Sequence, residues 1–370
     1  MSETVNSSIR DVLDPRNTKL NWMLVFVPLA FYFEFERLHG PAFIVSMIAI
    51  MPLAFLMGKA TEEIALRTSQ SIGGLLNATF GNAVEMIIAG LAIYTAYLSK
   101  DLEVSKAMIQ IVQASLIGSI LGNLLLVMGL SFVWGGIHYT KQKFSSEASQ
   151  VNGSLLLLAL VSMVIPEMYS SSTSGTAIVE LSHYTALLLL LVYFMQLLFQ
   201  FKTHSEIYAA EAHHDEVAEM SYRDSIVLLV GSTFFVALMA ESLVGSISHA
   251  AEEYHLPTLF IGVILVPLFG NAAEHFTAVT VAGKNKMDLS VGIAIGSSIQ
   301  IALFVTPIMV LMGWAMGVPM TLQFGSFETL VTFLAVLVAN FIIQDGESNW
   351  LEGAMLLITY GIIALAFFFL

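Results

Sequence analysis

Long apolar runs separated by short polar segments dominate the chain. A membrane-spanning helix needs roughly 20 apolar residues, and about eleven runs approach that length, although the first is short. The runs are Leu20–Phe35, Pro41–Ala60, Ile72–Leu98, Ala107–Trp134, Leu155–Ile165, Leu181–Phe201, Ser225–Ile247, Leu259–Val281, Leu289–Met316, Thr329–Ile343 and Leu351–Leu370. The pattern predicts an all-α integral membrane protein with about eleven transmembrane helices.

The distribution of Lys and Arg predicts how these helices are oriented. If the N-terminus is cytoplasmic, the outside segments hold only Arg37, Lys100 and Lys106 of the 14 basic residues. Cytoplasmic loops carry the excess of positive charge in membrane proteins. We therefore expect a cytoplasmic N-terminus and an outside C-terminus. The polar tail 1–19 has no signal-peptide core, which favours a prokaryotic inner membrane.

Composition supports this class and argues against others. The 370 residues are 57% hydrophobic and 11% charged, whereas a soluble domain is usually about 25% charged. The net charge of −14 argues against a nucleic-acid partner. Neither His-Glu-x-x-His nor Gly-x-Ser-x-Gly occurs, so we expect no enzyme and no organic cofactor. The lipid bilayer is the expected partner, and homo-oligomerisation is left open.

A six-residue motif, Phe-Gly-Asn-Ala-(Val/Ala)-Glu, occurs at 80–85 and again at 269–274, each time inside an apolar run. A carboxylate buried in hydrocarbon is costly and marks a functional site by default. In a continuous helix, residues three apart share a face, so Asn82 and Glu85 would point the same way, as would Asn271 and Glu274. Amide and carboxylate oxygens suit a hard cation such as Ca2+.

The two motifs belong to a longer internal repeat. Related stretches follow each motif, Ile117–Asn123 after the first and Ile295–Gln300 after the second. Five spans lie on each side of a polar break, and an odd number inverts the second copy relative to the first. Inverted repeats with glycine-interrupted helices are typical of secondary transporters, and Gly81 and Gly270 are the expected breaks. The expected divisions are a tail and first helix at 1–40, a five-helix repeat at 41–203, a cytoplasmic acidic linker helix at 204–221 and a second five-helix repeat at 222–370.

The chain closely resembles the calcium/proton exchanger family of the calcium/cation antiporter superfamily in two signatures. The first lies at residues 73–85, and the second lies at 270–275 followed by 296–302. The resemblance implies that Glu85 and Glu274 bind Ca2+ and exchange it for protons. The polar side chains that it places around them are Asn82, Asn271, Ser119, Asn123, Ser297 and Gln300. Asn123 stands one position past the equivalent of Gln300. The Gly-Thr-Ser-x-Pro-Glu type of motif of the sodium/calcium branch is absent from both copies.

The expected function is therefore secondary active antiport of Ca2+ against protons by alternating access. Two carboxylates match the charge of one Ca2+, and each can instead take a proton, so the two ions compete for the same oxygens. The alternatives are exchange of another cation, Mn2+ or Na+-coupled, or a cation channel. The glutamates could instead be structural, and the neighbouring polar residues could act only as contacts between helices.

Three further residues are candidates for a proton path. His275 follows Glu274 directly, and adjacent helix residues diverge by about 100°, so it does not share the ligand face. An interhelical hydrogen bond is slightly favoured over a proton-path role. Glu62 and Glu241 each precede the motif of their half, and apolar residues surround Glu241.

The linker carries a run of acidic residues, Glu211, Asp215, Glu216 and Glu219. Three of them recur at intervals of four and would form one acidic helix face. A charge run is usually a solvated surface. The family resemblance implies instead a regulatory Ca2+-sensing segment on the cytoplasmic side.

Overall fold

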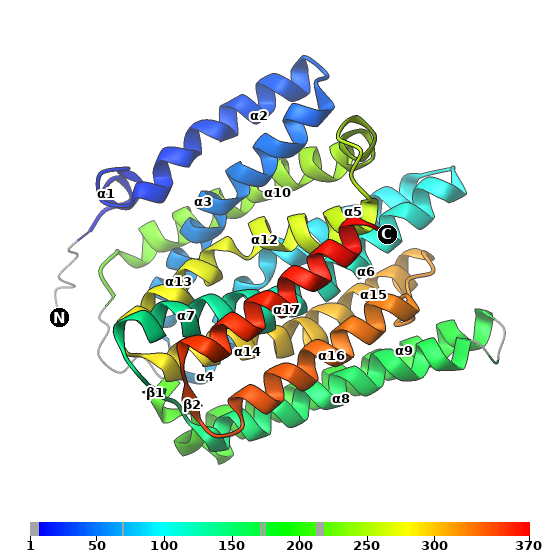
Figure 1. Cartoon of the computed structure of the whole chain (residues 1–370). Coiled ribbons are helices and arrows are strands. Elements are labelled where there is room, and N and C mark those ends of the chain that lie inside the picture. Colours follow the sequence, from blue (N-terminus) through cyan, green and yellow to red (C-terminus); the bar gives the residue numbers. More distant parts are fainter. Residues whose placement is uncertain (1–6, 69, 171, 173–174, 212–217) are drawn as a thin grey trace.

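The computed structural model describes residues 7–68, 70–170, 172, 175–211 and 218–370, which form a helical bundle (Figure 1). Eight unbroken stretches within this part of the chain are long and apolar enough to cross a membrane. Five are single helices: α3 (His39–Ala65), α8 (Ser146–Ser170), α10 (Tyr222–Glu253), α16 (Ser326–Ile343) and α17 (Trp350–Phe368). Two are α-helices joined by a π-helix: α6 (Leu102–Leu121), η2 (Gly122–Val127) and α7 (Met128–His138) form one, and α14 (Met287–Gln300), η6 (Ile301–Val305) and α15 (Thr306–Met316) form the other. The last is α9 (Gly175–Leu198), which is continued by the π-helix η3 (Phe199–Thr203).

Two further spans are bent helix pairs. The first joins α4 (Gln70–Gly81) to α5 (Ala83–Leu98), with a bend of 48°. The second joins α11 (Thr258–Phe260), η5 (Ile261–Leu265) and α12 (Val266–Gly270) to α13 (Ala272–Gly283), with a bend of 60°. These ten stretches match the second to eleventh predicted spans, and both bends fall within the repeated motif.

The first predicted span is shorter than the others. It consists of a 3-10 helix, η1 (Lys19–Val25), continued by α2 (Phe26–Phe35), which packs on α3. At 1.5 Å per residue α2 is about 15 Å long, roughly half the hydrocarbon thickness. A short helix, α1 (Ile9–Leu13), precedes it and is closed by a capping box between Ser8 and Asp11.

The helices of the two halves are interleaved. Helix α3 packs along α10, α7 contacts α13 and α17, α8 packs on α16, and α9 packs on α15. Figure 1 shows α2, α3 and α10 on one side of the bundle and α8, α9 and α16 on the other. A two-residue antiparallel pair joins β1 (Gln142–Lys143) to β2 (Glu347–Ser348). Most partners of a helix therefore come from the opposite half.

Burial separates central from peripheral spans. The most apolar window is 83% buried in Leu102–His138 and 72% buried in Met287–Met316, but only 17% buried in Gly175–Thr203. His39–Ala65 is also 72% buried, and the other two well-buried stretches are those that carry Ser119 and Ser297. The repeat therefore places its polar residues where lipid cannot reach them.

A cluster at the end of α3, here called the linker clamp, consists of Glu63, Arg67, Glu219 and Met220. The Glu63 carboxylate accepts the backbone N–H groups of Glu219 and Met220 at 3.0 Å and pairs with Arg67 at 3.2 Å. Arg67 also donates to the Met220 carbonyl. The chain that leaves the linker is thereby attached to α3, and Ser7 of the N-terminal tail pairs with the same segment.

Candidate functional site

Each motif breaks its helix at the asparagine. Asn82 lies between α4 and α5 with φ −99° and ψ 18°, and Asn271 lies between α12 and α13 with φ −93° and ψ 8°. The expected interruptions are therefore present, one residue after Gly81 and Gly270, and each asparagine lies outside the helix that carries its glutamate. Each asparagine precedes the first residue of a new helix, and each glutamate is the third residue of that helix. The positive end of the helix dipole favours negative charge at this position.

Neither asparagine side chain caps its own helix; both contact the opposite half instead. The Asn82 amide donates to Gln300 Oε1 at 2.6 Å, and its Oδ1 accepts the Ser297 hydroxyl at 3.3 Å. The Asn123 amide donates to Ser297 Oγ at 3.0 Å. The structure thus joins Asn82 and Asn123 of the first half to Ser297 and Gln300 of the second.

The second motif has a simpler contact. The Asn271 amide donates to Ser119 Oγ at 3.1 Å. Ser119 and Asn271 are both almost completely buried. All six polar residues expected around the carboxylates therefore lie in contacts that cross between the halves.

Unlike these hydrogen-bonded polar side chains, the two carboxylates have oxygens without hydrogen-bond donors. Glu85 is 8% exposed, and neither Oε1 nor Oε2 has a hydrogen-bond partner. Glu274 is half-buried, and its buried Oε2 also lacks a partner. The two carboxylates are close enough to repel each other when both are ionised. Buried polar atoms are nearly always satisfied, so these three unpaired oxygens are candidates to bind a cation, a proton or water.

The two glycines bring the breaks close to the opposite half. A Cβ added at Gly81 would lie 3.2 Å from Glu274 Oε1, so this carboxylate rests against the first break. A Cβ added at Gly270 would lie 3.8 Å from Val84, beside Glu85. Glu274 thus reaches the first break across the interface between the halves.

The donor set fits a hard divalent cation. Two carboxylates supply two negative charges, and Ca2+ accepts six to eight oxygen ligands from carboxylates, amides, hydroxyls, carbonyls and water. Among the described residues, no group of three or more His, Asp or Glu side chains is arranged to hold a metal ion. A cation bound here would therefore take its remaining oxygens from neutral groups and water.

The proton-path candidates are dispersed. His275 is 8% exposed, and its Nε2 has no partner, so an interhelical hydrogen bond through that nitrogen is not formed. Glu241 is exposed on the surface of α10, a candidate membrane span. Glu62 is half-buried near the end of α3, while its neighbour Glu63 forms the linker clamp. A proton path through these residues stays a prediction.

The acidic linker differs from the expected continuous helix. A 3-10 helix, η4 (Ser205–Glu211), ends at Glu211, and Glu219 lies outside any helix and is exposed. Asp215 and Glu216 lie outside the described residues. The expectation of one acidic helix face reaching Glu219 is therefore wrong, and a regulatory Ca2+ role stays a prediction.

Two features near the site have no signal in the sequence. The π-helix η2 begins directly after Leu121 and contains Asn123, and the π-helix η6 begins directly after Gln300, so each central span has a π-turn at or just past its polar residues. Such turns occur frequently at functional sites.

A second group of carboxylates, Glu167 and Glu328, lines a separate cavity. The apolar run Leu155–Ile165 ends before Glu167, and the run Thr329–Ile343 begins after Glu328. In the sequence, both glutamates therefore resemble the ordinary polar ends of membrane spans.

Paired broken helices that carry facing carboxylates in the centre of a bundle define a secondary transporter for cations. Residues 40–202 and 224–369 match the sodium/calcium exchanger protein family. The chain belongs to this family, and within it to the calcium/proton exchangers.

The relatives are similar over nearly the whole chain. A Ca(2+)/H(+) antiporter of Aphanothece halophytica is 44% identical, covering 96% of this chain and 97% of its own length. A vacuolar calcium ion transporter of Schizosaccharomyces pombe is 41% identical, covering 94% and 84%. The structure of native YfkE superposes with a TM-score of 0.80 at 38% identity, covering 94% of this chain and all of that one.

Proposed function

We propose that this protein exchanges Ca2+ for protons across a membrane, and that Glu85 and Glu274 are the shared ligands. The observation that carries the proposal is the convergence of three buried, unpaired carboxylate oxygens from the two halves. Relatives of similar length are named Ca(2+)/H(+) antiporters, which supports this choice of ions.

The exchange follows from charge. With both carboxylates ionised, the site carries two negative charges and can hold one divalent cation. With both protonated, the site is neutral, so it can change its accessibility without Ca2+. Intermediate states leave an uncompensated charge in hydrocarbon, which is costly. The site therefore favours either the bound cation or the two protons.

The neutral polar residues have a separate role in the proposal. Asn82, Ser297 and Gln300 hold one another, as do Asn271 and Ser119. These contacts fix the helix ends next to the carboxylates and supply oxygens at short range. Because every contact crosses between the halves, movement of one half against the other must change them. We therefore assign alternating access to the inverted repeats 41–203 and 222–370.

The alternative transport modes have weaker support. A sodium-coupled site would be expected to carry the Gly-Thr-Ser-x-Pro-Glu type of motif, which both copies lack. A channel needs a continuous path, whereas the described centre is closely packed around Ser119 and Ser297. The distribution of Lys and Arg supports a cytoplasmic N-terminus and an outside C-terminus. A prokaryotic inner membrane is the proposed location.

The test is a proton-driven 45Ca2+ flux assay in liposomes from which Na+ is omitted. Glu85→Gln and Glu274→Gln keep the shape and one oxygen but cannot ionise, so each should abolish exchange. Glu103→Gln is the matched control, because Glu103 is exposed at the start of α6 and pairs with nearby Lys106. Acidifying the side from which Ca2+ binds should inhibit the parent protein competitively.

Two results would overturn the proposal. Normal flux in folded Glu274→Gln protein would remove the carboxylate from the transport step. An absolute requirement for Na+ in the parent protein would replace the proton as the coupled ion.

A further inference from the structure

A second polar cavity lies beside α6, separate from the two motifs. It has a volume of about 390 Å3 and is bounded by α6, the end of α8, Leu259 of α11 and residues 323–328 at the start of α16. Its carboxylates are Glu167 and Glu328, and its amides include Gln110 and Gln113. None of its described lining residues is basic, so the two carboxylates are not neutralised by the wall.

Glu167 gives this cavity an unsatisfied acceptor. The residue is 8% exposed, and its Oε1 accepts the Ser326 hydroxyl. Its Oε2 is buried and has no hydrogen-bond partner. Leaving a charged oxygen buried without a partner is costly unless a ligand approaches it. Glu167 is one of the residues that line the cavity, so a cation bound there would lie beside its carboxylate.

Glu328 brings the second charge to the same place. It is the third residue of α16, and its carboxylate lies back over Gly325, where it leaves no room for a Cβ. The helix N-terminus favours negative charge at this position. Ser326, from the same helix start, contacts Glu167. The start of α16 therefore holds both carboxylates at one end of the cavity.

The wall opposite α8 is held in place by hydrogen bonds. The Gln113 amide donates to the carbonyls of Thr321 at 3.0 Å and Gln323 at 2.9 Å. The Leu322 N–H donates to Ser182 Oγ on α9 at 3.0 Å. Leu322 and Phe324 are buried. The segment before α16 is thus tied to two helices, so the cavity is formed before any ligand arrives.

The cavity is close to the motif site along α6. Ile117 lines the cavity, and Ser119, two residues further on, contacts Asn271. From Gln113 to Ser119 the helix rises about 9 Å, at 1.5 Å per residue. The cavity therefore lies on the side of the motif site toward the start of α6, which is the outer side in the proposed orientation.

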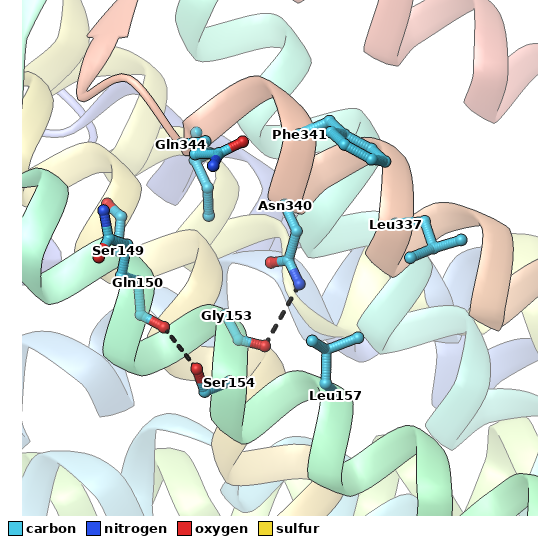
Figure 2. A pocket seen from close by; sticks show the side chains of 10 residues that line it. Ser149, Gln150, Gly153, Ser154, Leu157, Leu337, Asn340, Phe341 and Gln344 are labelled. Atoms are coloured by element: carbon cyan, nitrogen blue, oxygen red, sulfur yellow. Dashed lines mark hydrogen bonds between the residues drawn. The ribbon is translucent and has the colours of Figure 1, made fainter.

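The opposite end of the α8–α16 pair provides a contrast. A cavity of about 470 Å3 lies there between Ser149, Leu157 and Asn340 (Figure 2). The Asn340 amide donates to the Gly153 carbonyl at 3.3 Å. The described residues that line it include no charged side chain. Carboxylates are therefore present at only one of the two cavities between these helices.

We propose that the cavity of Glu167 and Glu328 is a second binding site for a divalent cation, occupied on the way between the outer surface and the motif site. This inference rests on the proposed function. A water molecule takes about 30 Å3 in the liquid, so the cavity has room for a cation that keeps several waters. Two carboxylates with few fixed neutral ligands favour weak binding and rapid release.

The first test measures binding without transport. Equilibrium dialysis with 45Ca2+ is run on purified protein in detergent, with Glu85→Gln and Glu274→Gln combined to remove the motif site. One weaker equivalent of Ca2+ should remain. Adding Glu167→Gln and Glu328→Gln should weaken that equivalent at least tenfold, whereas adding Glu103→Gln should not change it. No remaining equivalent, or one insensitive to the Glu167 and Glu328 changes, overturns the proposal.

The second test keeps the motif site intact and uses flux. Glu167→Gln in proteoliposomes should raise the KM for Ca2+ presented on the outer side about three- to tenfold. The KM on the inner side and the maximal rate should stay the same, a split that general misfolding would not produce. Equal changes on both sides contradict the proposal. Absence of proton-driven Ca2+ flux in the parent protein would instead refute the proposed function, while the dialysis result would still report on the cavity.

Discussion

The two motif glycines provide a matched pair of substitutions with unequal expected effects. Gly81 and Gly270 occupy the same position of the repeat, each as the last residue before a break, and neither has a positive φ. Alanine is therefore sterically allowed by the backbone at both positions. Both substitutions also remove the same backbone freedom from the break. They differ in what the added methyl group meets.

The magnitude follows from the two distances. At Gly81 the methyl carbon would lie 3.2 Å from Glu274 Oε1, about 0.2 Å inside ordinary contact, which begins at 3.4 Å. At Gly270 it would lie 3.8 Å from Val84, which is ordinary contact. Ca2+–oxygen distances span only about 2.3–2.6 Å, so a shift of a few tenths of an ångström is comparable to the whole permitted range. We expect Gly81→Ala to weaken Ca2+ binding about three- to tenfold, or up to about 1.4 kcal/mol.

The assay is the Ca2+ dependence of proton-driven uptake in proteoliposomes, with thermal unfolding measured in parallel. Gly81→Ala should raise the apparent KM for Ca2+ with little change in melting temperature, because the end of a flexible side chain can yield without disturbing the helices. Gly270→Ala should affect the KM distinctly less. Equal shifts in the two variants, or a larger one for Gly270→Ala, would refute the placement of Glu274 against the first break.

Two other expectations concern topology and packing. A reporter fused after Leu370 should lie outside and one inserted near His213 in the cytoplasm, as judged by accessibility to an impermeant reagent; finding both on one side would contradict the orientation. Gly118→Ala should destabilise the protein by about 1–3 kcal/mol, because its Cβ would overlap the Val263 carbonyl, and should lower the melting temperature. Gly122→Ala, with no atom within 4 Å of its Cβ, is the control, and an equally large loss there would rule out this contact as the cause.

The spans and the composition of the central site could be predicted because both depend on local sequence. A carboxylate inside an apolar run needs no knowledge of its neighbours to be noticed, and its repetition after a Gly-Asn pair pointed to both halves. The family resemblance added Ser119, Ser297 and Gln300, which the structure brings into contact with the two asparagines.

The features that sequence did not predict depend on contacts between segments. The pairing of Asn82 with Gln300, rather than within its own half, follows from the crossing of helices and has no local signal. The π-turns depend on packing as well. Glu241 is set among apolar residues in the sequence yet is exposed on α10, because position along a helix does not determine which face is covered. Glu167 has no distinct signal in the sequence, because Pro166 and the following polar residues resemble the end of a span.

The interleaved packing of the halves has a consequence for synthesis of the protein. A ribosome completes α3, α7, α8 and α9 well before it makes their partners α10, α17, α16 and α15. Each early helix can enter the bilayer alone, because its backbone is satisfied internally, but its contact face then meets lipid or a temporary companion. N-terminal domains usually fold first as independent units, an order that this topology does not permit. Assembly of the centre therefore waits until the second half, with Ser297 and Gln300, has been made.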